Sequence, residues 1–582
     1  MRHSSHHSIF DNIKKIPGNA SLLAMWVIAA LMIPNIVLCL TEPEPLLSGL
    51  SSFFLPLGVY SLIMAGVKRT GTGVFVVFPL IFFAAFQVVL LYLYGEGVIA
   101  VDMFLNVFTT SVSEATELLS NLVMAIVAVT LLYVTSIVWG AYALKTNIRL
   151  SARMARRFLF CGIVWCAIGA VCVGAGYFFI PGFSAVRSIF PANAVANLVE
   201  ACRRAGQMEN YHQTSGAFSY DAKSMADPNE RELYIFVVGE TGRAHNWSLG
   251  GYPRNTNPRL SEIKGLTYFP KSFSESNTTH KSVPMLISSA SAENFDSIYN
   301  YKSVITAFNE AGYHTAFFST QTPNRSYTQF FAEEADTTVY LSGGEFTAAH
   351  DGDLLPLLSH EIEKNHTKQF IVLHTYGSHF RYSDRYPEDF AHFTPDNSVD
   401  ASASNRPILI NAYDNTILYT DYVLSEIITA AAKAGCKAAV VYSTDHGEDI
   451  FDDSRERFLH ASPTPTAMQL HVPVLCWLSD ECIAQSPDYI INLRRNSRNC
   501  VSPQKSLCMT LFDIALIDSP FMRLEWSLVN AGYSEPRPVY LTDRNEPLPW
   551  SRVNFKSDDY KYLKAVLGDE KFDKLEINRC GK

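Results

Sequence analysis

The sequence predicts an α-helical membrane domain of five transmembrane helices, followed by an α/β domain with a mostly parallel sheet. Two observations support this fold class. Five long apolar segments without a charged residue occur before about residue 181, and the composition after that point is typical of a soluble protein. In the second half, short apolar runs alternate with helical stretches, which is the pattern of α/β proteins. The expected division is a transmembrane domain over 1–181, a linker with a helix over 182–231, an α/β domain over 232–550 and a C-terminal extension over 551–582.

The five apolar segments are long enough to cross a bilayer, which takes about 20 apolar residues in a helix. Buried helices of a large soluble core would instead carry charged faces, and these segments have none. The first segment is long and lacks a small-residue cleavage pattern, so we expect it to remain as an anchor. The predicted spans are Leu22–Leu40, Leu46–Val67, Val74–Tyr94, Leu122–Leu144 and Phe158–Ile180.

The charges of the connecting loops predict the orientation of the spans. Positive residues precede the first span and join the second to the third and the fourth to the fifth, whereas the other loops carry only acidic residues. By the positive-inside rule, the N-terminus is cytoplasmic and the α/β domain lies outside, which in a bacterium is the periplasm or the cell surface. The positive residues are Lys14, Lys15, Lys68, Arg69, Lys145, Arg149, Arg153, Arg156 and Arg157.

The loop between the third and fourth spans predicts an interfacial helix at about residues 98–119. Its apolar residues recur at helical spacing, and Asn106, Thr110 and Glu114 follow one another at four-residue steps. Side chains at this spacing share one face of a helix. Such a helix can simply lie in the membrane interface. The alternative is that the polar stripe binds a lipid head group.

Five short apolar runs predict strands in the second half, and a long stretch at three- and four-residue spacing predicts a helix over Asn411–Ala434. A further helix is expected over Ser184–Arg204 in the linker. The predicted strands are Tyr234–Val238, His314–Phe318, Gln369–His374, Ala438–Ser443 and Val472–Leu478.

Two of these strands end in possible metal ligands. Leu233–Val238 is a nearly continuous apolar run, typical of a strand buried on both faces, and Glu240 follows it after one glycine. Asp445 and His446 follow the other strand. Ligands of open α/β sheets bind just beyond the carboxyl ends of the strands. Two carboxylates and an imidazole there predict a Zn²⁺ site, although either acid taken singly also fits a strand end that faces water.

A cluster of hydroxyl residues and two histidines complete the candidate chemistry. The segment Ser274–Pro284 places hydroxyls ahead of a helix expected to begin near Thr279. A threonine at that position is either an ordinary N-cap or a nucleophile toward a phosphate held at the helix N-terminus. His379 and His460 are either surface histidines or proton donors to a leaving alkoxide.

Charge and cysteine content exclude other classes of function. The net charge of -9, with no basic stripe in the soluble half, excludes a nucleic-acid surface. The chain has 11 cysteines but no Cys-x-x-Cys spacing, so a structural zinc finger is not expected. Among the soluble cysteines, Cys482 and Cys500 bracket a loop and form the most plausible pair.

The block Gly239–Arg259, which begins Gly-Glu-Thr-Gly-Arg, closely resembles the signature of the lipid A phosphoethanolamine transferases. These are five-span inner-membrane enzymes of the alkaline phosphatase/sulfatase superfamily. The resemblance extends over nearly the whole chain, including the order of the motifs. It implies a sulfatase-like fold for the α/β domain, a bacterial inner-membrane location with this domain in the periplasm, and a monomer.

The resemblance also implies residue roles. Thr279 matches the family's nucleophile and fourth zinc ligand, and it lies five residues before Pro284. The family's zinc ligands are matched by Glu240, Asp445 and His446. Its second-site histidines, which contact substrate, are matched by His379 and His460. Its lipid head-group residues on the loop helix are matched by Asn106, Thr110 and Glu114.

Three departures from the family pattern concern the surroundings of these residues. Where a disulfide often flanks the nucleophile, this chain has Glu275 and Met285. The residue before His379 is Ser378 rather than the commoner asparagine. A substrate-contacting lysine is replaced in its segment by Arg325, which we expect to bind substrate. These departures bear on the acceptor rather than on the reaction.

The function implied is transfer of phosphoethanolamine from phosphatidylethanolamine to lipopolysaccharide, on a lipid A phosphate or a core sugar, through a phospho-threonine intermediate and with release of diacylglycerol. The alternative enzyme is a phosphoglycerol transferase acting on a periplasmic glycan or glycolipid, which shares the five spans and the threonine nucleophile. An arylsulfatase is disfavoured because no Cys/Ser-x-Pro-x-Arg motif surrounds Thr279. A membrane-anchored binding protein without activity is disfavoured by retention of the whole set of chemical residues.

Overall fold

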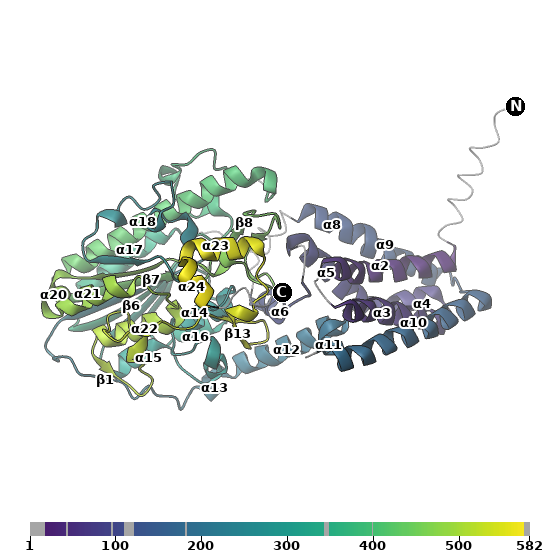
Figure 1. Ribbon diagram of the computed structural model, residues 1–582, viewed down its shortest axis with the longest axis horizontal. Coiled ribbons are helices and arrows are strands. Elements are labelled where there is room, and N and C mark those ends of the chain that lie inside the picture. Colours follow the sequence, from purple (N-terminus) through teal and green to yellow (C-terminus); the bar gives the residue numbers. More distant parts are fainter. Residues whose placement is uncertain are drawn as a thin grey trace. The chain divides into compact units, whose positions relative to one another are not determined.

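A computed structural model of the protein describes most of the chain. The chain separates into two compact units, a membrane unit (1–104 and 118–202) and an α/β unit (105–117 and 203–582) (Figure 1). Side chains are described throughout the structure except for those of residues 106–109. The residues described are 18–41, 45–94, 97–109, 122–180, 183–342, 349–397 and 400–575.

The membrane unit contains four helices long and apolar enough to span a bilayer, or five if a bent pair counts as one span, among the residues described. The bent pair joins α4 to α5 at an angle of 60°. Pro79 lies in the first turn of α5, where it lacks an N–H and its ring clashes with the carbonyl four residues earlier, so a straight helix is disfavoured there. The helices are α2 (Ala20–Thr41), α3 (Leu46–Gly66), α4 (Thr70–Val76), α5 (Phe78–Tyr94), α8 (Val123–Val129) continued through a π-helical turn into α9 (Thr135–Lys145), and α10 (Ala152–Phe179). The division between the two units falls within α6 (Val101–Thr109).

Helices α3 and α10 pack at glycines that allow their backbones to approach closely. A Cβ at Gly58 would lie 2.6 Å from the backbone nitrogen of Cys166, and a Cβ at Gly169 would lie 2.7 Å from that of Leu55. Both distances are shorter than a side chain tolerates. Close approach at small residues is the usual basis of helix packing in a membrane, where no hydrophobic force acts between helices.

The helix expected over Ser184–Arg204 is divided in the structure. A short helix, α11 (Ala185–Ser188), is followed by α12 (Ala192–Glu209) and α13 (Tyr211–Thr214). Pro191 lies in the gap, and a proline cannot donate the backbone hydrogen bond that would continue α11. The spacing of apolar residues is helical on both sides of this break, so periodicity alone did not reveal it.

The α/β unit is built on a seven-stranded sheet in the order β3-β10-β7-β2-β6-β4-β5, which confirms the mostly parallel sheet. Neighbouring strands from β7 to β5 are parallel, whereas β10 pairs antiparallel with both β7 and β3. The strands are β3 (Leu266–Phe269), β10 (Val474–Leu478), β7 (Lys437–Thr444), β2 (Glu232–Gly239), β6 (Lys368–His374), β4 (His314–Ser319) and β5 (Thr337–Tyr340).

Every residue of β2 is buried, which shows that both faces of the sheet are covered at this strand. Its side chains alternate, so that Tyr234, Phe236 and Val238 enter one hydrophobic core, and the residues between them enter a second core on the other face. The first core is closed by α14 (Thr279–Leu286), α15 (Val304–Glu310), α16 (Tyr327–Ala332) and α22 (Pro503–Ile514). The second is closed by α17 (Leu354–Glu363) and α18 (Arg406–Lys433), which lie side by side (Figure 1).

Smaller elements surround this framework. Leu563 of α23 belongs to the same buried cluster as Phe273, which precedes α14 in the chain, so the C-terminal helices pack against the segment leading to that helix. The smaller elements are α19 (Ala467–Leu470), α20 (Asp480–Gln485), α21 (Pro487–Asn496), α23 (Ser557–Leu567), α24 (Asp569–Lys574), β1 (Lys223–Ser224), β8 (Asp449–Ile450), β9 (Phe458–Leu459), β11 (Ile517–Asp518), β12 (Val539–Leu541) and β13 (Pro547–Pro549).

A buried acid joins the amino ends of three parallel strands. Glu232 begins β2 and is 0% exposed. Its carboxylate lies 3.3 Å from Nζ of Lys368, which begins β6, and 3.0 Å from Nζ of Lys437, which begins β7. It also accepts a hydrogen bond from the hydroxyl of Tyr313. One negative charge therefore compensates two lysines that are themselves buried.

We expect Glu232→Ala to lower the free energy of unfolding by about 3–5 kcal/mol, because it leaves two buried ammonium groups without their counter-charge. Denaturant unfolding of the purified chain in detergent measures this loss. The matched control is Glu262→Ala, at an exposed glutamate, which should change stability by no more than about 0.5 kcal/mol. Equal effects of the two substitutions would contradict the assignment.

Candidate active site

The candidate site lies at the carboxyl ends of β2 and β7, two central parallel strands. Glu240 is the residue after β2, and Asp445 is the residue after β7. Gly239 pairs with Thr444, and the backbone N–H of Asp445 donates to the Gly239 carbonyl at 3.1 Å. This register places the two carboxylates beside each other at one edge of the sheet, where open α/β sheets bind their ligands.

Four donor atoms converge at this edge. Nε2 of His446 lies 3.2 Å from Oδ2 of Asp445 and 3.6 Å from Oε1 of Glu240. Oγ1 of Thr279 lies 3.1 Å from the same oxygen of Glu240 and 3.1 Å from Nε2 of His446. The structure thus brings together the four residues expected from the sequence to bind a metal.

These spacings fit a tetrahedral zinc ion. Ligand atoms held about 2.0–2.1 Å from zinc in tetrahedral geometry lie about 3.3 Å from one another. The four separations just given range from 3.1 to 3.6 Å. Nδ1 of His446 lies 2.9 Å from the Gly447 carbonyl, so this nitrogen carries the proton and Nε2 presents its lone pair to the other donors.

Burial makes the site favourable for a cation. Burial and the neighbouring Asp445 raise the pKa of Glu240 well above its usual range, and burial raises the pKa of Asp445 to about 6. Burial and the nearby His460 lower the pKa of His446 well below its usual range, which keeps the ring neutral and able to ligate. The carboxylates are therefore poorly compensated by the protein itself, and a divalent cation would compensate both.

Thr279 is distinguished from its neighbour Thr278 by what its hydroxyl contacts. Thr279 is the first residue of α14 and faces the donor cluster, whereas the hydroxyl of Thr278 lies 3.1 Å from that of Ser276. One turn further on, Oγ of Ser282 lies 2.9 Å from the Thr278 carbonyl and 3.2 Å from Oδ2 of Asp445. The start of α14 is therefore tied to the Asp445 carboxylate, which positions the Thr279 hydroxyl.

The two predicted histidines lie beside the donor cluster. The ring of His460 is 4.1 Å from the ring of His446, and the ring of His379 is 5.9 Å from that of His460. Nδ1 of His379 lies 2.7 Å from the Phe380 carbonyl, which directs the other nitrogen away from the backbone. Burial lowers the pKa of His460 to about 4, so this ring is neutral at pH 7.

The other predicted substrate-binding residues are not brought to this cluster by any described contact. Asn106 belongs to α6, but its side chain is outside the described residues, as are Thr110 and Glu114 entirely. Arg325 is exposed, and its backbone N–H donates to the Gln329 side chain at 2.7 Å. The proposed roles of these four residues remain predictions.

Gln321 is a site residue that the sequence analysis missed. Its amide Nε2 donates to Oε2 of Glu240 at 3.3 Å and to the Thr375 carbonyl at 2.8 Å. The oxygen of Glu240 that accepts this hydrogen bond is the one that does not contact Thr279, so Gln321 orients the Glu240 carboxylate. Gln321 comes two residues after the end of β4, so the strand-end reasoning that identified Glu240 also applied here.

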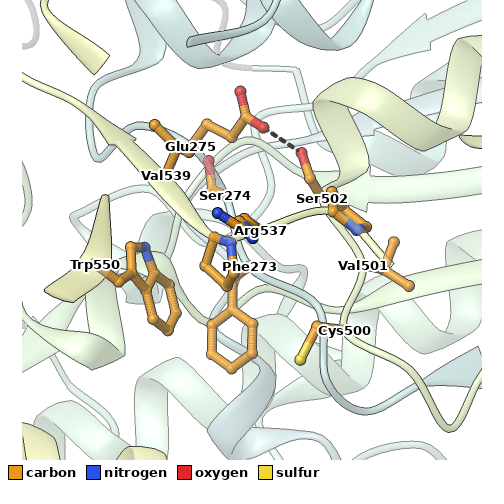
Figure 2. A pocket seen from close by; sticks show the side chains of 11 residues that line it. Phe273, Ser274, Glu275, Cys500, Val501, Ser502, Arg537, Val539 and Trp550 are labelled. Atoms are coloured by element: carbon orange, nitrogen blue, oxygen red, sulfur yellow. Dashed lines mark hydrogen bonds between the residues drawn. The ribbon is translucent and has the colours of Figure 1, made fainter. Parts of the chain in front are cut away.

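The segment before Thr279 is held by a buried carboxylate rather than by a disulfide. Glu275 accepts hydrogen bonds from Oγ of Ser502 at 2.8 Å and from the backbone N–H of Ala292 at 2.7 Å. Figure 2 shows the Glu275–Ser502 bond at the wall of a pocket that Cys500 also lines. Nζ of Lys505 lies 3.6 Å from the same carboxylate. Polar contacts thus fix this segment, in which Glu275 stands where the family resemblance implied a disulfide cysteine.

The expected pairing of Cys482 with Cys500 is wrong. Both thiols are free in the structure. They belong to different buried clusters. Cys482, in α20, is part of the first core of the sheet, whereas Cys500 packs in a separate cluster with Phe273 and Trp550. Sequence separation suggested a closed loop, but the helix α21 between them carries the chain to another part of the domain.

Comparisons of the sequence identify relatives of the α/β unit. Residues 232–498 match the sulfatase family. The chain is 33% identical over 270 residues to the phosphoethanolamine transferase EptA of Salmonella typhimurium, covering 44% of this chain and 48% of the relative. It is 29% identical over 272 residues to the Kdo(2)-lipid A phosphoethanolamine 7''-transferase of Escherichia coli K12, covering 45% and 47%. The matched region is therefore about half the length of these curated relatives.

Solved structures share the fold. The integral membrane lipooligosaccharide phosphoethanolamine transferase A (EptA) of Neisseria meningitidis aligns with a TM-score of 0.69 at 22% identity, covering 88% of this chain and 98% of that one. The periplasmic domain of EptC from Escherichia coli, solved in complex with zinc, aligns with a TM-score of 0.52 at 23% identity, covering 57% and 96%. The combination of membrane helices with a sulfatase-like domain is thus confirmed.

We expect the metal-free protein to lose stability as the pH rises through about 6. The Asp445 carboxyl has a pKa of about 6 in the folded state against 3.8 ordinarily, so folding favours its protonated form. This contribution to the free energy of unfolding is fully present below pH 3.8, the ordinary pKa, and is lost as the pH rises through the folded pKa of about 6. Added Zn²⁺ should restore stability above this range, since it replaces the proton.

Thermal unfolding in EDTA and in Zn²⁺, measured between about pH 4 and pH 8, tests this expectation. Asp445→Asn is the control, because its amide cannot ionise. In EDTA it should flatten the pH profile, and in Zn²⁺ it should gain less stability than the unsubstituted protein. Identical profiles for the two proteins in EDTA would refute the assigned shift.

Proposed function

We propose that the chain is a phosphoethanolamine transferase of the sulfatase/alkaline phosphatase superfamily, which transfers phosphoethanolamine from phosphatidylethanolamine to lipopolysaccharide. The acceptor group is a lipid A phosphate or a core sugar. The observation that carries the proposal is the position of the Thr279 hydroxyl, 3.1 Å from both a carboxylate oxygen of Glu240 and a ring nitrogen of His446.

In the first half of the proposed reaction, Oγ1 of Thr279 attacks the phosphorus of the donor lipid. The new bond is O–P to threonine, and the bond that breaks joins phosphorus to the glycerol oxygen, which takes a proton and leaves as diacylglycerol. In the second half, an acceptor oxygen attacks the phospho-threonine and regenerates the hydroxyl. Two displacements at one phosphorus need a nucleophile held in a fixed position, which the contacts of α14 support.

The residues that would hold Zn²⁺ are Glu240, Asp445 and His446, with Thr279 as the fourth ligand. When bound, zinc lowers the pKa of a coordinated hydroxyl and stabilises negative charge on a phosphoryl oxygen. Gln321 would keep Glu240 oriented toward the nucleophile through its 3.3 Å hydrogen bond. The fit of the four donor spacings to tetrahedral geometry supports this metal.

His379 and His460 are proposed to handle protons and the phosphoryl group. His460 is adjacent to His446 and neutral near pH 7, so its ring is suited to hydrogen-bond an incoming phosphate oxygen. His379 is partly exposed and its ring lies 5.9 Å from that of His460, so it could reach a leaving glycerol oxygen or an approaching acceptor. These positions support His460 as the group that positions the phosphate and His379 as the general acid and base.

The remaining parts of the proposal concern location and substrate contacts. We place the α/β unit in the periplasm and the N-terminus in the cytoplasm, supported by the loop charges. Asn106, Thr110 and Glu114 would contact a lipid head group, and Arg325 would contact a substrate anion from its exposed loop. Donor, acceptor and surrounding membrane lipids are then all reached from one leaflet.

We expect Thr279→Ala to lower transfer by at least about 10³-fold, the scale of removing a covalent nucleophile. Zinc content should largely persist, since three protein ligands remain. Thr279→Ser should retain part of the activity because it keeps the hydroxyl. Incubation with phosphatidylethanolamine alone should give an adduct on a peptide containing Thr279, detected by mass spectrometry.

Thr278→Ala is the matched control for this experiment. Its hydroxyl contacts Ser276 rather than the donor cluster, so the substitution should leave the adduct in place. An adduct that maps to Thr278, or turnover by Thr279→Ala, would show that the nucleophile has been assigned to the wrong residue.

The acceptor is tested by mass spectrometry of lipopolysaccharide from cells with and without the protein. The expected product carries one added phosphoethanolamine group on lipid A or on a core sugar, and fragmentation separates these two positions. Cells that produce Asp445→Ala should lack the addition. Transfer of a phosphoglycerol group to a glycan instead would identify the alternative enzyme and overturn the proposed donor.

A further inference from the structure

A second group of metal-binding side chains lies at the opposite edge of the sheet from Glu240. His314 is the first residue of β4, His366 comes two residues before β6, and Glu361 lies in the last turns of α17. Since β4 and β6 run parallel to each other and β6 to β2, their amino ends lie far from the carboxyl ends that carry the candidate active site. The group therefore plays no part in the chemistry proposed above.

The ligand atoms of these three residues are close enough to share one ion. One nitrogen of each histidine and one carboxylate oxygen of Glu361 all lie within 4.8 Å of one another. Nε2 of His314 is 3.2 Å from Oε1 of Glu361, which matches the separation of about 3.3 Å between ligands of a tetrahedral zinc ion. The rings of His314 and His366 stack with their centroids 4.1 Å apart, and His366 is partly exposed.

Two of these atoms are buried polar atoms that make no hydrogen bond in the structure. Nε2 of His314 and Oε1 of Glu361 face each other without hydrogen-bond geometry, and the Glu361 residue is only 1% exposed. Buried polar atoms are nearly always satisfied, because desolvating them without a partner is unfavourable. A cation between the two atoms satisfies both at once.

The neighbouring groups leave these two atoms available to an ion. The other nitrogen of His314, Nδ1, lies 3.3 Å from Oδ2 of Asp336. A ring protonated at Nδ1 toward this carboxylate would leave Nε2 as a ligand. The other oxygen of Glu361 accepts a hydrogen bond from Nζ of Lys364 at 2.7 Å. Outer contacts of this kind orient metal ligands in known sites.

We propose that His314, Glu361 and His366 form a second metal site, which binds a divalent transition-metal ion of the Zn²⁺ class at the amino end of the sheet. Two imidazoles and one carboxylate suit zinc, whereas Mg²⁺ and Ca²⁺ require mainly oxygen ligands. Three protein ligands leave one coordination position for water. The ion would join α17 to the starts of β4 and β6, so its role is to stabilise the domain.

The test uses the full chain in detergent with the first metal centre removed by Asp445→Ala and His446→Ala together. After dialysis against buffered Zn²⁺ and then against metal-free buffer, elemental analysis should find one zinc ion per chain. Excess Mg²⁺ should not displace it. Zinc should also raise the thermal unfolding temperature of this variant, since an ion that binds only the folded state stabilises it.

Adding His366→Ala should abolish both the bound zinc and the thermal shift. The matched control is His360→Ala, an exposed histidine on the same helix as Glu361 that is outside the cluster; it should leave both measurements unchanged. Glu361→Gln, which keeps the shape but removes the charge, should weaken zinc binding at least tenfold. Absence of zinc from the variant without the first centre, or zinc unaffected by His366→Ala, would overturn the proposal and leave the cluster as an ordinary set of ion pairs.

Discussion

The active-site architecture depends on the parallel pairing of β2 with β7. Because Gly239 is held opposite Thr444, the next residues along both strands are acids, and the two carboxylates are forced together in a buried position. Like charges at such a position are unfavourable in the absence of a cation. The surrounding contacts are arranged around this constraint: the N–H of Thr241 and the hydroxyl of Ser282 face Asp445, and the amide of Gln321 faces Glu240.

Two clusters of buried charge, one at each edge of the sheet, are compensated in different ways. At the amino edge, Glu232 is compensated by two lysines and a tyrosine of the protein itself, so the cluster is complete without a ligand. At the carboxyl edge, the acids are left under-compensated, and the pKa of Asp445 rises to about 6. A structural cluster and a ligand site can thus share one sheet, and the balance of charge distinguishes them.

The support of Thr279 shows how one constraint can be met by different chemistry. Glu275 holds the segment before α14 through Ser502, Ala292 and the nearby Lys505, in the place where the family pattern has a disulfide. A covalent bond acts mainly on the unfolded chain, whereas a buried carboxylate acts through hydrogen bonds that need their partners in place. The position of Thr279 in this chain therefore depends on the packing of α22, where Ser502 is the N-cap.

Much of the fold and of the candidate site could be predicted from the sequence, because the signals involved are local. A continuous apolar run followed by Glu240, and another followed by Asp445 and His446, identify buried strands with ligands at their ends. The length of uncharged apolar segments likewise located the spans, and helical spacing located α18. Gln321 carried the same strand-end signal and was overlooked, since an amide has no distinctive chemistry until a carboxylate lies beside it.

Only the tertiary structure decided which distant segments meet. The antiparallel direction of β10 and the separation of Cys482 from Cys500 depend on packing between elements, which composition and periodicity do not encode. The same holds for the choice between Thr278 and Thr279: two identical residues differ only in where the start of α14 directs their hydroxyls. The sequence by itself determined the kinds of strands, spans and ligands, because these follow from neighbouring residues. The structure determined their contacts, because these follow from residues far apart in the chain.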